Sequence, residues 1–135
     1  MNNKFLFRIR LENKIVGYKK YMSAKLYFFS KDLYGFSAKE INYDEQDQAT
    51  GYMNKNGMQI FENDILIDPK GIIYAVSANS VDVNLTFFRI QNDTITQIPM
   101  QTFSELAKTL KQYSYLFINE ALKNRLNAIE LDYDI

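Results

Sequence analysis

The chain has 135 residues, equal numbers of acidic and basic side chains, and neither cysteine nor histidine. These absences exclude disulfides and thiolate or imidazole metal ligands, and no apolar run approaches the roughly 20 residues that span a bilayer. No signal-peptide pattern opens the chain. We therefore expect a cytoplasmic protein without membrane contact and without a cofactor.

Short strands separated by turns are predicted for the first part of the chain. The first strand alternates from Phe5 onward, with Arg8 and Arg10 on one face and, on the other, the apolar residues Phe5, Phe7, Ile9 and Leu11. Lys19 and Lys20 interrupt the pattern after the second strand. The polar, acidic residues 38–48 suit a loop. The four predicted strands are residues 5–11, 15–18, 25–29 and 33–36.

Basic side chains interleave with tyrosines in this region and form a possible binding face. Proteins that bind single-stranded nucleic acid combine cations for the phosphates with rings for base stacking. A solvated sheet face rich in tyrosine has the same pattern, so both interpretations stay open and nucleic acid is not the favoured partner. The candidate face consists of Arg8, Arg10, Tyr18, Lys19, Lys20, Tyr21, Lys25 and Tyr27.

Residues 50–66 predict a hairpin followed by a tight corner. Asn56 and Gly57 alone suit a two-residue turn, because both tolerate positive φ. The alternative is a three-residue loop that begins at Asn54, ends with Gly57 in the left-handed conformation, and pairs Asn54 with Met58. We favour this second register, because an Asn side chain at the first turn position can bond the backbone two residues further on.

The corner comes next, and it contains two carboxylates. Asn63 suits the left-handed conformation, and Asp64 can then accept backbone N–H bonds. Glu62 and Asp64 could instead hold Mg²⁺, which would support a carboxylate-metal enzyme. We favour the structural interpretation, because carboxylates in turns usually stabilise the turn.

The same stretch resembles the signature T-G-L-x-D-K-N-G-x-x-I-Y-E-G-D-I-V of the YopX family of phage and prophage proteins. The chain matches it at Thr50, Gly51, Lys55, Asn56, Gly57, Ile60, Glu62, Asp64 and Ile65. The chain departs from the signature at Tyr52, Asn54, Phe61, Asn63 and Leu66. Each of these residues still suits a turn or a core. The resemblance implies a phage or prophage origin and an SH3-like fold, and it brings no established activity. We take as the structural signature Thr50, Gly51, Asn54, Asn56, Gly57, Glu62, Asn63 and Asp64.

Helical patterns are predicted near the end of the chain. Thr102 and Glu105 have capping-box spacing, and apolar residues recur at helical spacing over residues 103–112. Asn119 is expected to cap a short helix that runs to about Leu126. The further strands are predicted at residues 72–76, 81–90, 94–98 and 115–118.

The number of short strands between Tyr52 and Ile118 favours a small, strongly bent, SH3-like barrel. We predict a mainly β fold, α+β overall, with one or two short helices. Residues 1–48 would be an N-terminal β extension or subdomain. Residues 49–135 would be a YopX-like barrel domain that includes the C-terminal helices.

The functional hypotheses follow from the catalytic residues and motifs that the sequence lacks. Without His, Cys, a phosphate-binding loop or a nucleophile–base pair, the first hypothesis is a non-catalytic module that binds an unknown host or phage protein. Nucleic-acid binding is the second hypothesis and a carboxylate-metal enzyme is the third. Self-association is also expected, because ten Tyr and ten Phe are hard to bury in a chain of this size. Residues 1–40 carry nine basic and three acidic side chains, and the rest carry seven and thirteen. This asymmetry suits either a basic surface for nucleic acid or attraction between the two parts, within or between protomers, and we favour the attraction.

Overall fold

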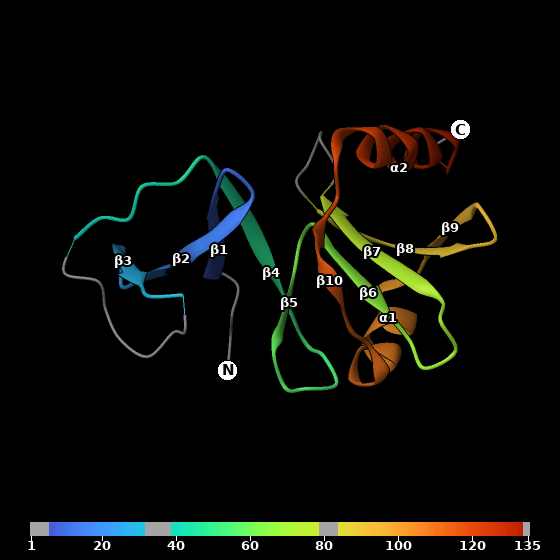
Figure 1. Ribbon diagram of the computed structural model, residues 1–135, viewed down its shortest axis with the longest axis horizontal. Helices are drawn as coiled ribbons and strands as arrows, with labels where there is room; N and C mark the ends of the chain where they lie inside the picture. The colour runs from blue at the N-terminus through green and yellow to red at the C-terminus, as the bar shows by residue number, and fades with distance from the viewer. Residues whose placement is uncertain (1–5, 32–38, 79–83, 134–135) are drawn as a thin grey trace. The chain divides into compact units, whose positions relative to one another are not determined.

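The computed structural model describes residues 6–31, 39–78 and 84–133, and the chain divides into two units (Figure 1). The units are Met1–Gly51 and Tyr52–Ile135, whereas the sequence placed the boundary after residue 48. Within the described residues the fold is mainly β with two helices, as predicted, and its strands form two antiparallel sheets. The elements are β1 (Leu6–Leu11), β2 (Lys14–Met22), β3 (Lys25–Phe29), β4 (Glu45–Met53), β5 (Gln59–Phe61), β6 (Asp64–Ile67), β7 (Ile73–Ala78), β8 (Leu85–Gln91), β9 (Thr94–Ile98), α1 (Met100–Leu106), a 3₁₀ turn (Ala107–Thr109), β10 (Lys111–Phe117) and α2 (Glu120–Tyr133).

The first sheet has the strand order β3-β2-β1-β4-β5. Its first two hairpins close through two-residue loops, Glu12 with Asn13 and Ser23 with Ala24. These four residues have φ between 51° and 65°, as a type I′ turn requires at both central positions. Asn tolerates this left-handed conformation, but Ser and Ala adopt it at a cost in free energy.

Two predictions about this sheet are wrong. Residues 38–48 do not form a loop throughout, because β4 begins at Glu45 and pairs with β1. Lys19 and Lys20 do not interrupt the second strand, since β2 continues to Met22 and pairs with β1 on one side and with β3 on the other. In both places, hydrogen bonding to neighbouring strands outweighs the weak strand preference of charged residues. The strand predicted at residues 33–36 lies outside the described residues.

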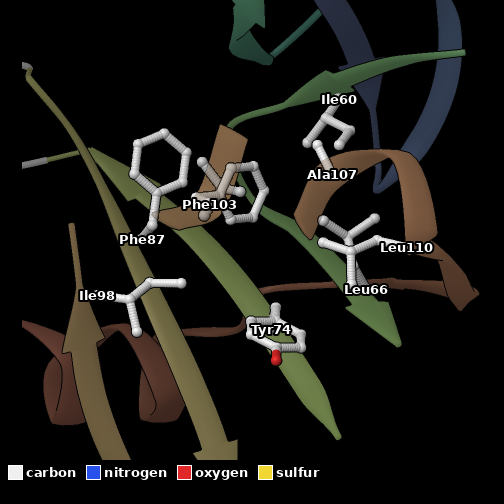
Figure 2. Packing of buried hydrophobic residues seen from close by; sticks show 9 residues of the cluster. Ile60, Leu66, Tyr74, Phe87, Ile98, Phe103, Ala107 and Leu110 are labelled. Atoms are coloured by element: carbon white, nitrogen blue, oxygen red, sulfur yellow. The ribbon is translucent and has the colours of Figure 1, made fainter. Parts of the chain in front are cut away.

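The second sheet has the order β10-β6-β7-β8-β9, and its two faces are covered by different helices (Figure 1). Alternation along β7 directs Tyr74 and Val76 toward α1 and Ala75 toward Leu126 of α2. Figure 2 shows the cluster of buried apolar side chains between this sheet and α1. In it the rings of Phe87 and Phe103 are stacked, with their centroids 4.3 Å apart. The residues of this cluster are Ile60, Leu66, Tyr74, Val76, Phe87, Ile98, Phe103, Ala107 and Leu110.

The predicted SH3-like barrel is not confirmed, because the two sheets are not closed. The second sheet buries one face against α1 and the other against α2, so its strands have no need to curl into a closed barrel to cover their apolar side chains. The structure therefore has two open five-stranded sheets where the sequence suggested an SH3-like barrel.

The helices differ from prediction at their ends. α1 begins at Met100 after Pro99, with no side-chain cap, so the predicted capping box is absent. Proline is accommodated at this end because a missing backbone N–H costs nothing there. The helix then tightens into the 3₁₀ turn, and Leu110 is buried. The cap at Asn119 is confirmed, since its Oδ1 accepts the N–H of Leu122 at 2.8 Å, but α2 extends beyond the predicted end to Tyr133.

Candidate functional site

The signature hairpin has the three-residue loop that we favoured. The N–H of Asn54 donates to the carbonyl of Met58 at 2.8 Å, and the N–H of Gly57 donates to the carbonyl of Asn54 at 3.0 Å. Gly57 has a φ of 74°. The Oδ1 of Asn54 accepts the N–H groups of Asn56 and Met58 at 2.9 and 3.1 Å. The preferred register is therefore confirmed, and Asn54 holds the loop closed.

The same hydrogen-bond pattern occurs a second time, outside the signature. The N–H of Asp68 donates to the carbonyl of Ile72 at 3.0 Å, and the N–H of Gly71 donates to the carbonyl of Asp68, also at 3.0 Å. Its Oδ1 accepts the N–H groups of Lys70 and Ile72, each at 2.9 Å. Because the chain closes two hairpins in this way, the signature loop needs no function beyond making a turn.

Of the two corner carboxylates, Asp64 has a structural role. Asn63 has a φ of 71°, as predicted. The buried Asp64 accepts the N–H of Phe61 through Oδ2 at 2.9 Å and the side-chain amide of Gln112 through Oδ1 at 3.4 Å. Glu62 is half-buried. Among the described residues, no three acidic side chains gather closely enough to hold a metal ion. The predicted role of Asp64 as an acceptor of a backbone N–H is confirmed.

The predicted basic face is mostly not on the surface. Arg8 and Arg10 are buried with Asp47, whose exposed fraction is 0%. The Nε atoms of both arginines donate to Asp47 Oδ2 at 2.7 and 2.8 Å, and Arg10 Nη2 donates to Oδ1 at 2.9 Å. The expectation of a solvated face here is wrong, because β4 pairs with β1 and sets Asp47 opposite Arg8. We call this group the Arg8–Asp47–Arg10 cluster.

Lys19 lies inside the first unit as well, with only 4% of its surface exposed. Its Nζ donates to the hydroxyl of Tyr43 at 2.7 Å, and it lies 4.7 Å from the ring centroid of Tyr43 and 5.4 Å from that of Phe7. Among the described residues, no carboxylate pairs with Lys19. The two rings and the hydroxyl therefore supply the favourable electrostatics that a buried ammonium needs.

The other members of the predicted face lie on the β2–β3 hairpin, and all of them except Tyr18 are at least partly exposed to solvent. Tyr18 is buried, Lys20 and Tyr27 are half-buried, and Lys25 is exposed. Tyr21 is 44% exposed and pairs across the hairpin with Leu26, which is 39% exposed. A surface hollow of about 540 Å³ adjoins Tyr21. We call this surface the hairpin patch, and its residues are Phe7, Tyr21, Ser23, Ala24 and Leu26.

Sequence reasoning missed two residues that shape this unit. Asp47 was placed in an acidic loop, although it lies two residues before the buried Ala49 and so shares a face of β4 with it. Tyr43 gave no signal at all, because its contact with Lys19 joins residues that are distant in the sequence. Comparison with family models, with curated proteins and with solved structures finds no match to this chain. Among the described residues, none of the helices combines the length and the apolar character needed to cross a membrane.

Proposed function

We propose that this chain is a non-catalytic binding module that contacts another protein through the hairpin patch. The observation that carries the proposal is the exposure of Tyr21 and Leu26, side by side, next to an apolar hollow. Exposed aromatic and aliphatic side chains around a concavity are typical of protein-binding surfaces. In line with the YopX resemblance, we propose a phage or prophage protein that acts in the cytoplasm on a host or phage partner.

The burial pattern favours a protein partner over nucleic acid. Binding to a nucleic-acid backbone requires several cations that can reach phosphates. Three of the five cations in the predicted face, Arg8, Arg10 and Lys19, are buried. Of the five, Lys20, which is half-buried, and Lys25, which is exposed, remain.

The alternative of a carboxylate-metal enzyme at Glu62 and Asp64 has less support than the binding module. Both carboxylate oxygens of Asp64 accept hydrogen bonds within the protein. A carboxylate that is already used in this way serves the turn rather than a metal ion.

The proposal is tested by capture experiments with immobilised protein at low and high salt. The wild type is compared with Tyr21→Ser and with Lys108→Ser, a control that removes an exposed side chain of the second unit outside both proposed surfaces. Truncation of a central aromatic typically costs 2 kcal/mol or more, so Tyr21→Ser should weaken capture about thirtyfold. The control should capture the same protein as the wild type. No reproducible partner, or equal capture by all three proteins, would refute the proposal.

We also propose that the chain forms homo-oligomers. Among the described residues of the second unit, four large apolar side chains are exposed, namely Met53, Met58, Met100 and Tyr113. Apolar surface of this kind is commonly covered by a second copy in symmetric assemblies. Sedimentation velocity at micromolar concentration tests this, and a single species near the chain mass of 15.9 kDa would refute it.

A further inference from the structure

The outer edge of the first sheet is formed by β3, which comes first in the strand order. The two-residue loop makes Met22 and Lys25 a hydrogen-bonded pair, and the pattern alternates from there. The backbone groups of Tyr27 therefore point toward β2, whereas those of Leu26 and Phe28 point away from the sheet. Within the described residues, no strand pairs with this outer side of β3. An edge with unpaired N–H and C=O groups is a template for one more strand.

The charge around this edge has one sign. Between Glu12 and Asp32 the chain contains five lysines and no acidic residue. Lys25 is the first residue of β3, and Lys31 follows its end, both exposed. A second copy of β3 placed here would bring like charges together, whereas an acidic segment would be attracted.

The two faces of the edge differ in a way that specifies the pattern of an added strand. Leu26 and Phe28 lie on one face, across from Tyr21 and Lys19 of β2. Lys25 and Tyr27 lie on the other face, where Lys20 is opposite Tyr27. Because side chains alternate between faces, an added strand would place every second side chain beside Leu26 and Phe28, and the others beside the lysines.

We propose that β3 accepts an extended segment of another protein as an added strand, in which apolar residues alternate with acidic ones. The apolar residues would lie beside Leu26 and Phe28 and lead toward the hollow next to Tyr21. The acidic residues would lie near Lys20 and Lys25. This inference rests on the proposed protein-binding function, and it names the mode of binding and the chemistry of the partner segment.

The first test selects ligands from a library of random short peptides displayed on phage, with the full chain as the target. We expect the selected peptides to alternate acidic and apolar residues, and their affinity for the chain should fall as salt is added. Each winner is then synthesised with single N-methylated amides. Methylation of amides that face β3 should abolish binding, and methylation of the neighbouring amides should leave it within about threefold, because only alternate amides of an added strand donate to the edge.

The second test changes the edge itself. Leu26→Pro removes an outward N–H without removing a bond to β2, so the protein should keep its circular dichroism spectrum. Loss of the one backbone hydrogen bond that this N–H donates leaves a carbonyl of the peptide without its donor, and predicts weakening of the selected peptide on the order of thirtyfold. Leu26→Ala is the matched control, because it keeps the N–H and should weaken binding by less than about tenfold.

Several outcomes would overturn the proposal. They are the absence of any selected peptide, winners without acidic and apolar alternation, binding that ignores N-methylation, and a labelled single-stranded DNA that competes for the same edge. A dimer that Leu26→Pro dissociates would show that a second copy occupies β3. A partner that is lost with Tyr21→Ser but retained by folded Leu26→Pro protein would refute strand addition while leaving the proposed function intact.

Discussion

Removing the charge of Asp47 should destabilise the first unit strongly. Asp47 is the common acceptor for two buried guanidinium groups, with three hydrogen bonds between 2.7 and 2.9 Å. In the Asp47→Asn variant, an uncharged amide faces both arginines, and its NH₂ group meets other donors. Breaking a buried ion pair by removing one partner costs about 3–5 kcal/mol, because the remaining charge stays buried without compensation. The free energy of unfolding of a native domain is about 5–15 kcal/mol, so the variant should lose a large part of its stability.

Urea unfolding followed by circular dichroism measures this loss. The control is Glu45→Gln, an exposed carboxylate on the same strand, which should change the free energy of unfolding by less than about 0.5 kcal/mol. Replacing the whole cluster by apolar residues, as in Arg8→Met with Arg10→Met and Asp47→Leu, should restore most of the stability, because no buried charge is then left unpaired. If Asp47→Asn unfolded at the same urea concentration as Glu45→Gln, the reasoning would be refuted.

Three further predictions concern the close packing, the turns and the pH dependence. Gly17→Ala would place a Cβ 2.5 Å from the backbone oxygen of Phe29 and should lower the free energy of unfolding by about 1–3 kcal/mol, so an unchanged melting temperature would contradict it. Ala24→Gly should raise the free energy of unfolding by about 0.5–1 kcal/mol, because Ala24 has a φ of 65°, whereas Ala128→Gly within α2 should lower it by about 1 kcal/mol. Equal effects of these two substitutions in thermal melts would show that the turn is not strained. Burial raises the pKa of Tyr74 above its ordinary value of 10.0, so the native state holds this proton more tightly than the unfolded state does. Stability should therefore be complete below about pH 10 and fall above it, and urea unfolding of Tyr74→Phe should show a smaller fall than the wild type.

The sequence by itself determined the local features of this protein. The loop at Asn54, the left-handed corner at Asn63 and the cap at Asn119 were all predicted and are all observed. Each depends on one side chain that bonds, or bends, the backbone within four residues of itself. The mainly β character also followed from the sequence, because β-branched and aromatic residues favour strands whatever their partners are.

Only the tertiary structure decided which polar residues are buried. The alternation in β1 correctly put Arg8 and Arg10 on one face, but the pattern assigned that face to solvent. Asp47, which neutralises charge there, is almost forty positions away in sequence, at a separation of 39 from Arg8. Lys19 is likewise held by Tyr43, at a separation of 24. Period-two patterns report which side chains share a face, whereas the burial of a charged face depends on partners that only folding brings into contact.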